Sequence, residues 1–275
     1  MTDRTRPASS PEGGVVLVSP RYLAGGGDPR WVTAPLHQAF HWQAAHLPLS
    51  PRVRLTRRDR QAELILSPDP DTYWWTLRHT ATGTGGREEG EEEGWVMRFG
   101  ARTPAETIAA ATDLLTTSPL GQKADPLDLP DPLGVLSRAG WESSGEDMFR
   151  TSPDGLVTVC HPPQGAWLIS VTSHDGPWRS DPDDLVWHAY FSPHTPAPLV
   201  TAVLEDLASP EPLPRTPGSL PDVLRDLARL TLAPAAAAQG RDALWERVDR
   251  LAAHRPTGTP RPPQPPGGPL PRRSR

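Results

Sequence analysis

The chain has 275 residues, 36 of them proline, a hydrophobic fraction of 36% and a formal net charge of −5. The length allows two domains of ordinary size, and the acidic balance excludes a general electrostatic attraction to nucleic acid or to anionic membranes. The single cysteine, Cys160, excludes an internal disulfide and a zinc site made of several thiolates. No apolar run is long enough to cross a bilayer and the first residues lack the apolar segment of a signal peptide, so we expect a cytoplasmic protein with no membrane partner.

Matching residues recur at a constant offset of 92 positions, and the matches include two pairs of tryptophans. The matched pairs are Trp75 and Trp167, Trp95 and Trp187, Phe99 and Phe191, Thr103-Pro104 and Thr195-Pro196, and Leu115 and Leu207. Such self-similarity indicates two divergent copies of one structural unit.

In chain order, each copy predicts a short helix, a set of strands and a longer helix. The short helices are expected at 35–42 and 132–141. Apolar and polar residues alternate in the segments that follow, as they do in half-buried strands. These strands are expected at 52–55, 62–66, 75–77 and 95–99 in the first copy, and at 148–150, 156–161, 167–171 and 187–191 in the second.

A helix is expected to follow the last strand of each copy. Thr103 and Thr195 are predicted as its N-caps, with Pro104 and Pro196 at the first helical position and Glu106 completing a capping box. Apolar residues at helical spacing then predict that each helix covers one face of its sheet. The fold class is therefore α+β: two tandem units, each with a short helix, about four antiparallel strands and a covering helix.

The remaining segments differ from the two copies in composition. We expect a disordered N-terminus at 1–14, a first domain at 15–118, a linker at 119–131, a second domain at 132–213, C-terminal helices at 214–254 and a disordered Pro/Arg tail at 255–275. The C-terminal helices are predicted at 219–232 and 235–254, and we expect them to pack on the second domain or against each other.

Several of these residues resemble a known family, the actinobacterial SPDY domain, which occurs in one or two copies. The resemblance rests on residues 18–28 (Val-Ser-Pro-Arg-Tyr-Leu-Ala-Gly-Gly-Gly-Asp), on Ser-Pro-Asp-Gly at 152–155 and on the Trp…Trp…Phe…Thr-Pro-Ala series of both copies. It covers roughly 15–118 and 133–213 and implies no activity, because the function of the domain is unknown. The first copy departs from the pattern, with Arg-Arg-Asp-Arg at 57–60. From the residues themselves, Ser-Pro-Asp-Gly is a type I turn between two strands.

No residue set indicates catalysis or cofactor binding. His37, His41 and His46 have partly helical spacing but lack a carboxylate or thiolate nearby, so we interpret them as surface histidines. The glycines at 25–27 lack the Lys-Ser/Thr of a phosphate-binding loop and are interpreted as a flexible turn. No Gly-x-Ser-x-Gly motif positions a nucleophile, and Cys160 lies in an apolar strand pattern typical of a core residue. We therefore assign no catalytic, cofactor-binding or metal-ligating residue and expect no cofactor.

An interaction surface is the remaining candidate. It has two parts. One is an arginine-rich stretch with Arg52, Arg54, Arg57 and Arg58. The other is Trp74, which is expected on the outer face of the sheet beside Arg78. Arginines of this kind can bind phosphates, and an aromatic ring on an open sheet can stack on a base. Five glutamates within 88–93 of the same domain are expected to screen this stretch or to fold over it.

We expect a non-catalytic binding or scaffold protein that uses exposed sheet faces of two tandem domains, with a protein as its partner. The alternative is a nucleic-acid-associated protein that uses the arginine stretch and the basic tail. An enzyme ranks third, because no residue can be given a role.

Overall fold

The computed structural model describes residues 14–45, 51–68, 73–80, 94–117, 131–144, 147–162, 165–174, 184–233 and 240–254. The loop with the five glutamates, residues 1–13 of the predicted N-terminal segment, nearly all of the predicted linker and the predicted tail at 255–275 lie outside these described residues. Within them, no helix is long and apolar enough to cross a membrane.

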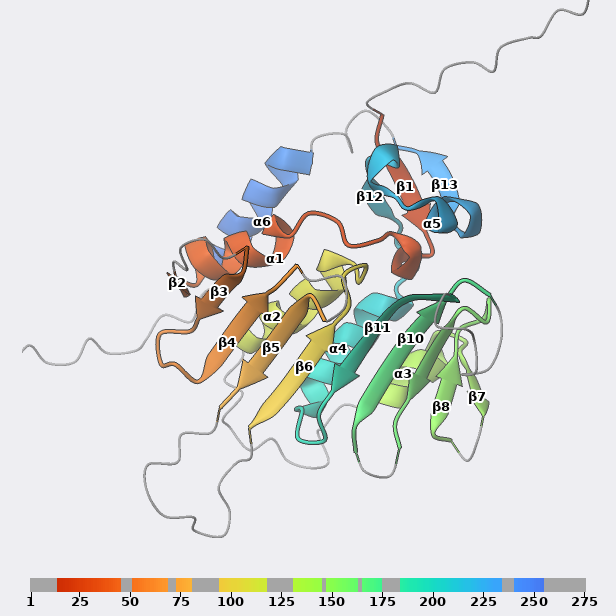
Figure 1. Ribbon diagram of the computed structural model, residues 1–275, viewed down its shortest axis with the longest axis horizontal. Coiled ribbons are helices and arrows are strands. Elements are labelled where there is room, and N and C mark those ends of the chain that lie inside the picture. The colour runs from red at the N-terminus through yellow and green to blue at the C-terminus, as the bar shows by residue number, and fades with distance from the viewer. Residues whose placement is uncertain are drawn as a thin grey trace, which may run out of the picture.

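The two copies form one continuous antiparallel sheet of ten strands (Figure 1). Its strands, in spatial order, are β2 (Gln43–Ala45), β3 (Val53–Thr56), β4 (Ala62–Leu66), β5 (Trp75–His79), β6 (Trp95–Phe99), β11 (Leu185–Phe191), β10 (Trp167–Thr172), β9 (Val157–Cys160), β8 (Phe149–Thr151) and β7 (Glu142–Ser144). The copies join where the last strand of the first, β6, pairs with the last strand of the second, β11. Each copy contributes five strands rather than about four, because a three-residue edge strand was not predicted.

The helices of both copies cover one face of this sheet, and Figure 1 shows no described element over the other face. They are α1 (Arg30–Ala34), which continues into the π-helix η2 (Pro35–Ala39), α2 (Ala105–Thr117), α3 (Pro132–Arg138) and α4 (Ala197–Ala208). The two longer helices, α2 and α4, pack side by side across the junction of the copies. The predicted α+β class with two tandem units is confirmed.

The matched tryptophans lie in the core between sheet and helices, as predicted. Trp75, Trp95, Trp167 and Trp187 are at most 7% exposed. At the junction, the rings of Phe99 and Phe191 are 5.4 Å apart and tilted by 59°, a favourable aromatic arrangement. Residues that the repeat pairs in sequence thus lie on the same inner face and form a single core across both copies.

A second, smaller sheet joins the N-terminal strand to two strands that follow the second copy. It consists of β1 (Val16–Ser19) between β12 (Leu213–Arg215) and β13 (Arg229–Leu232). The predicted helix over 219–232 is therefore wrong in its second half: η5 (Pro217–Ser219) and α5 (Asp222–Leu227) precede a strand that pairs with β1. Leucine spacing fits a helix here, but pairing with the edge of β1 overrides it.

The last helix, α6 (Gly240–Ala253), was predicted on the second domain or against its neighbouring helix. It packs instead on α1 and η2 of the first copy. Arg247 fixes this position, because its Nη2 bonds both carboxylate oxygens of Asp113 at 2.8 and 2.7 Å and its guanidinium lies 5.1 Å from the ring centre of Trp31.

The predicted caps of the covering helices are also wrong. The α4 helix begins at Ala197 with Pro196 as its N-cap residue, and the Thr103 hydroxyl at the start of α2 has no hydrogen-bond partner within the described residues. Glu106 forms no capping box there, because its carboxylate accepts two bonds from Arg215, at 2.9 and 2.7 Å. A tertiary ion pair thus replaces the local cap.

Candidate functional site

The Ser-Pro-Asp-Gly segment forms the turn between β8 and β9, as predicted. The Gly155 amide donates to the Ser152 carbonyl at 2.9 Å, and Gly155 has a φ of 75°. The Asp154 Oδ1 accepts from the Ser152 hydroxyl at 2.6 Å and from the Leu156 amide at 3.2 Å. These hydrogen bonds give Ser152, Asp154 and Gly155 a structural role in the turn.

The N-terminal Ser-Pro-Arg-Tyr segment binds this turn. The Tyr22 hydroxyl donates to the Asp154 Oδ2 at 2.5 Å, and the Trp187 indole N–H donates to the Tyr22 carbonyl at 2.8 Å. Burial, together with the bond to Asp154, raises the pKa of Tyr22 above its usual value. We call the Tyr22–Asp154 bond the tyrosine latch, since it holds the N-terminal segment against the second copy.

Two further ion pairs lie around the N-terminal segment. The Arg21 guanidinium donates to Asp206 on α4 at 2.6 Å, and Asp206 also accepts from the Thr107 hydroxyl on α2 at 2.7 Å. Burial raises the pKa of Asp206, and Arg21 offsets this only in part. Arg215 binds Glu106 and the Ala24 carbonyl. These buried pairs join the segment to both covering helices.

The glycines at 25–27 belong to this segment and form a defined turn. Gly25 and Gly27 have φ values of 67° and 69°, in the left-handed region that favours glycine. A side chain at Gly26 would place its Cβ 2.8 Å from the Ala101 carbonyl oxygen. Close packing and the left-handed backbone therefore explain the glycines of this turn.

The turn at 57–60 is the counterpart of the Ser-Pro-Asp-Gly turn. Arg57 donates its amide to the Ala62 carbonyl at 2.9 Å, as Ser152 does to Val157 at 2.9 Å. Asp59 Oδ1 accepts from the Gln61 amide, as Asp154 does from Leu156. Arg57 and Arg58 are therefore turn residues: Arg57 is half-buried and paired with Asp59, while Arg58 is exposed.

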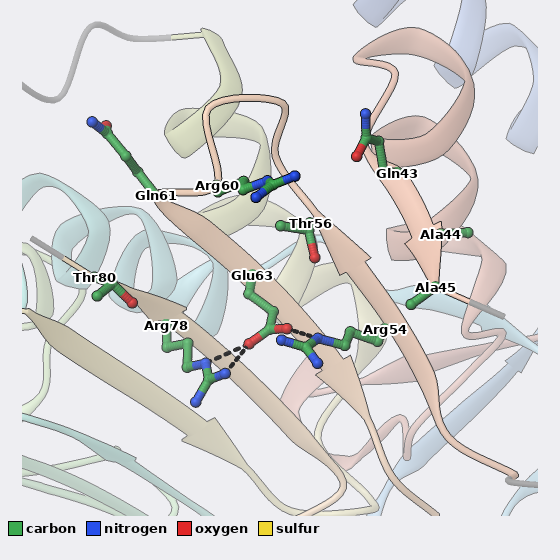
Figure 2. A pocket seen from close by; sticks show the side chains of 10 residues that line it. All are labelled: Gln43, Ala44, Ala45, Arg54, Thr56, Arg60, Gln61, Glu63, Arg78 and Thr80. Carbon is green, nitrogen blue, oxygen red and sulfur yellow. Dashed lines mark hydrogen bonds and ion pairs between the residues drawn. The ribbon is translucent and has the colours of Figure 1, made fainter. Parts of the chain in front are cut away.

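Two of the predicted arginines meet at one carboxylate on the open face of the sheet. Glu63 on β4 lies directly opposite Arg78 on β5, and Arg54 reaches it from β3 (Figure 2). Glu63 is only 5% exposed, whereas the side chains of Arg54 and Arg78 are 46% and 48% exposed. Burial of a carboxylate requires such pairing, because an unpaired buried charge is very costly.

The three residues line a hollow of about 400 Å³. It lies over β2 to β5. Arg60 lies at the end beside the turn, and Gln43 on β2 lies at the same end (Figure 2). Three arginines and one glutamate give the lining an excess of positive charge within a chain whose net charge is negative. We call it the arginine hollow.

A second group lies on the same face at the junction of the copies. Arg98 on β6 lies opposite Tyr190 on β11, and its guanidinium carbon is 6.0 Å from the ring centre of Tyr73. The rings of Tyr73 and His188 are 4.5 Å apart in an edge-on arrangement. Burial lowers the pKa of His188, so its imidazole is neutral at pH 7. Tyr73, Arg98, His188 and Tyr190 form what we call the junction cluster, which needs both copies.

The structure separates the remaining predicted surface residues. Trp74 is half-buried and packs against the core, and its buried indole N–H lacks a hydrogen-bond partner among the described residues. Arg52 is exposed just before β3. Sequence analysis missed Glu63 and the junction cluster; the alternation within β4 and the pairing of β4 with β5 could have placed Glu63 beside Arg78.

The two described histidines of the predicted group lie on the surface and the cysteine lies in the core, as predicted. His37 and His41 are exposed, the helix ends at Ala39, and His41 adopts a φ of 56°. His46 lies outside the described residues, and within those residues no group of three or more His, Cys, Asp or Glu side chains is placed to hold a metal ion. Cys160 is buried, which raises the pKa of its thiol and disfavours a nucleophilic thiolate.

Comparison with known families decides the identity of the repeat. The family model of SPDY, a domain of unknown function (DUF317), matches residues 56–120 and 151–213. The chain carries two SPDY domains. Each matched segment starts at the turn after β3 or β8 and ends beyond the covering helix, so the SPDY core includes the turn, three strands and that helix. Comparison with the curated proteins and with the solved structures found no match.

Proposed function

We propose that this tandem SPDY protein is a non-catalytic binding or scaffold protein, acting in the cytoplasm, which holds an acidic protein partner on the open face of its ten-stranded sheet. One observation carries the proposal: the junction cluster lies at the centre of a sheet whose described covering helices lie on the other face (Figure 1). Tyrosine and arginine contribute most strongly to protein interfaces when they lie near the centre of the contact.

Charge supports an acidic partner. Arg54, Arg78 and Arg98 point outward from this face, and Glu63 is the one acidic side chain among the described outward positions of β3 to β6. The positive face stands on a chain with a net charge of −5, so an acidic partner would be steered to it and away from the rest of the surface.

The experiment compares the full-length chain with two variants. Tagged protein is purified from its own cells, with and without nuclease, as wild type, Arg98→Gln and Arg225→Gln. Arg225 is an exposed arginine of α5, away from the sheet face, and serves as the matched control. We expect a protein partner that survives nuclease, dissociates at high salt, binds the Arg225→Gln protein and is lost with Arg98→Gln. Equal recovery with both variants, or turnover of a substrate in an unbiased metabolite screen, would contradict the proposal.

A second candidate is binding of single-stranded nucleic acid. The stacking of Arg98 on Tyr73 beside Tyr190 favours it, because aromatic rings and arginines on an open sheet can stack on bases. The basic tail at 255–275 would add nonspecific affinity. Partners that nuclease removes, together with salt-dependent binding of purified protein to single-stranded DNA or RNA, would support this candidate over the first.

A further inference from the structure

The residues at the arginine hollow differ from those at the equivalent positions of the second copy, although the strands of the two copies pair in the same register. Register identifies the equivalent residues: Glu63 and Arg78 are directly paired between β4 and β5, as Thr158 and Ser170 are between β9 and β10. Arg54 lies opposite Ile65, as Phe149 lies opposite Cys160. The second copy therefore has neutral residues wherever the first has the charged trio.

This comparison shows that the fold does not require the charges. Glu63 loses most of its hydration at 5% exposure, and neutral replacements of buried ion pairs are often as stable or more stable. On the equivalent strands of the second copy, the neutral residues Phe149, Thr158 and Ser170 stand in place of the charged trio, and all three are half-buried. The charged trio is thus better explained by a ligand than by stability.

The hydrogen bonds of the trio leave donors for a ligand. Glu63 accepts from the Nε of Arg54 and from the Nε and Nη2 of Arg78. Among the described residues, no acceptor takes the two terminal nitrogens of Arg54 or the Nη1 of Arg78, and Arg60 forms no ion pair. Glu63 thereby holds two planar guanidinium groups in fixed orientations, a geometry suited to a planar or tetrahedral oxyanion.

We propose that the arginine hollow binds a small molecule bearing a carboxylate or phosphate group. The oxyanion binds the terminal nitrogens of Arg54 and Arg78 that Glu63 leaves unused. Arg60 lies at the turn end of the site, and Gln43 and Thr80 offer neutral hydrogen bonds to the rest of the molecule. The hollow, at about 400 Å³, falls within the usual range for small-molecule sites. This site is separate from the junction cluster, although Arg54 and Arg78 also contribute to the positive face of the proposed function. Its test uses small anions and needs no protein partner, so its failure is distinguishable from the failure of the proposed function.

The test titrates the full-length protein with inorganic phosphate and with citrate, and uses chloride at equal ionic strength as the reference. Binding is followed by calorimetry and by the Nε–H NMR signals of Arg54 and Arg78. The test variant carries the residues of the second copy at four positions: Arg54→Phe, Arg60→Gly, Glu63→Thr and Arg78→Ser. Because an equivalent backbone already accepts these residues, we expect the variant to fold, which circular dichroism checks. Arg58→Gln, an exposed arginine of the same turn, is the matched control.

We expect one of the two anions to bind the wild type and the Arg58→Gln protein with equal affinity, to shift the Arg54 and Arg78 signals, and to bind the test variant at least about tenfold more weakly. Preference for phosphate or for citrate identifies the anionic group of the ligand. Absence of binding beyond the chloride reference, or equal binding by the folded test variant, would overturn the proposal. Should that variant fail to fold, Arg60→Gln alone is compared with Arg58→Gln, and equal affinities would again overturn it.

Discussion

Removing the hydroxyl of the tyrosine latch measures how strongly the N-terminal segment is held to the second copy. In Tyr22→Phe the ring, 6% exposed, keeps its edge-on contact with Trp141, so only one hydrogen bond is lost. The lost bond is 2.5 Å long and has a carboxylate acceptor, a class worth about 1.5–3 kcal/mol. Asp154 is exposed and keeps two donors on its Oδ1, so water can replace the hydroxyl. We therefore expect a loss at the lower end, about 1.5 kcal/mol of unfolding free energy.

Urea denaturation monitored by tryptophan fluorescence measures this loss, and the melting temperature should fall by roughly 3–6 °C. Tyr73→Phe is the matched control, because the Tyr73 hydroxyl forms no hydrogen bond within the described residues, and its stability should change by less than about 0.5 kcal/mol. Equal effects of the two substitutions would refute the latch. Asp154→Asn combined with Tyr22→Phe should be less destabilising than the sum of the single changes.

Three further results are expected. Folding raises the pKa of Tyr22, so the latch contributes its full stability below the ordinary tyrosine pKa and loses it as pH rises. Above about pH 10, the unfolding free energy of the wild type should fall by up to about 1.4 kcal/mol per pH unit more than that of Tyr22→Phe. Urea denaturation at each pH measures this difference. Arg247→Met leaves the Asp113 carboxylate, whose side chain is 25% exposed, without its partner. We expect a loss of about 1–3 kcal/mol, less than for a fully buried pair, and faster amide exchange throughout α6 than in α4. Gly26→Ala places a Cβ 2.8 Å from the Ala101 carbonyl and should cost about 1–3 kcal/mol in thermal unfolding, whereas Gly218→Ala, with open space at that position, should cost much less.

Periodicity and the repeat predicted the parts of the fold that local sequence controls. Alternation placed Trp75 and Trp167 on the inner face, and the turn residues at 152–155 placed the β8–β9 turn. A two-residue period determines which face a side chain occupies, whatever its neighbouring strands are. The fold class therefore followed from the sequence alone.

Partners distant in the chain could not be predicted in this way. The Leu230 position fits a helical stripe, but it lies in a strand that pairs with the edge of β1. Glu106 has the spacing of a capping box, and Arg215, far along the chain, takes its carboxylate instead. The junction cluster depends on the pairing of β6 with β11, for which neither copy alone carries a signal.

The tyrosine latch distinguishes the two equivalent turns. The chain has one Ser-Pro-Arg-Tyr segment, and that segment crosses to the second copy, where Asp154 must bind both Tyr22 and its own turn. The equivalent Asp59 of the first copy binds only its own turn within the described residues, and its side chain is 45% exposed. A single crossing segment can constrain only one of two equivalent turns. The other turn carries Arg57 and Arg60 without such a contact, and the arginine hollow lies beside it.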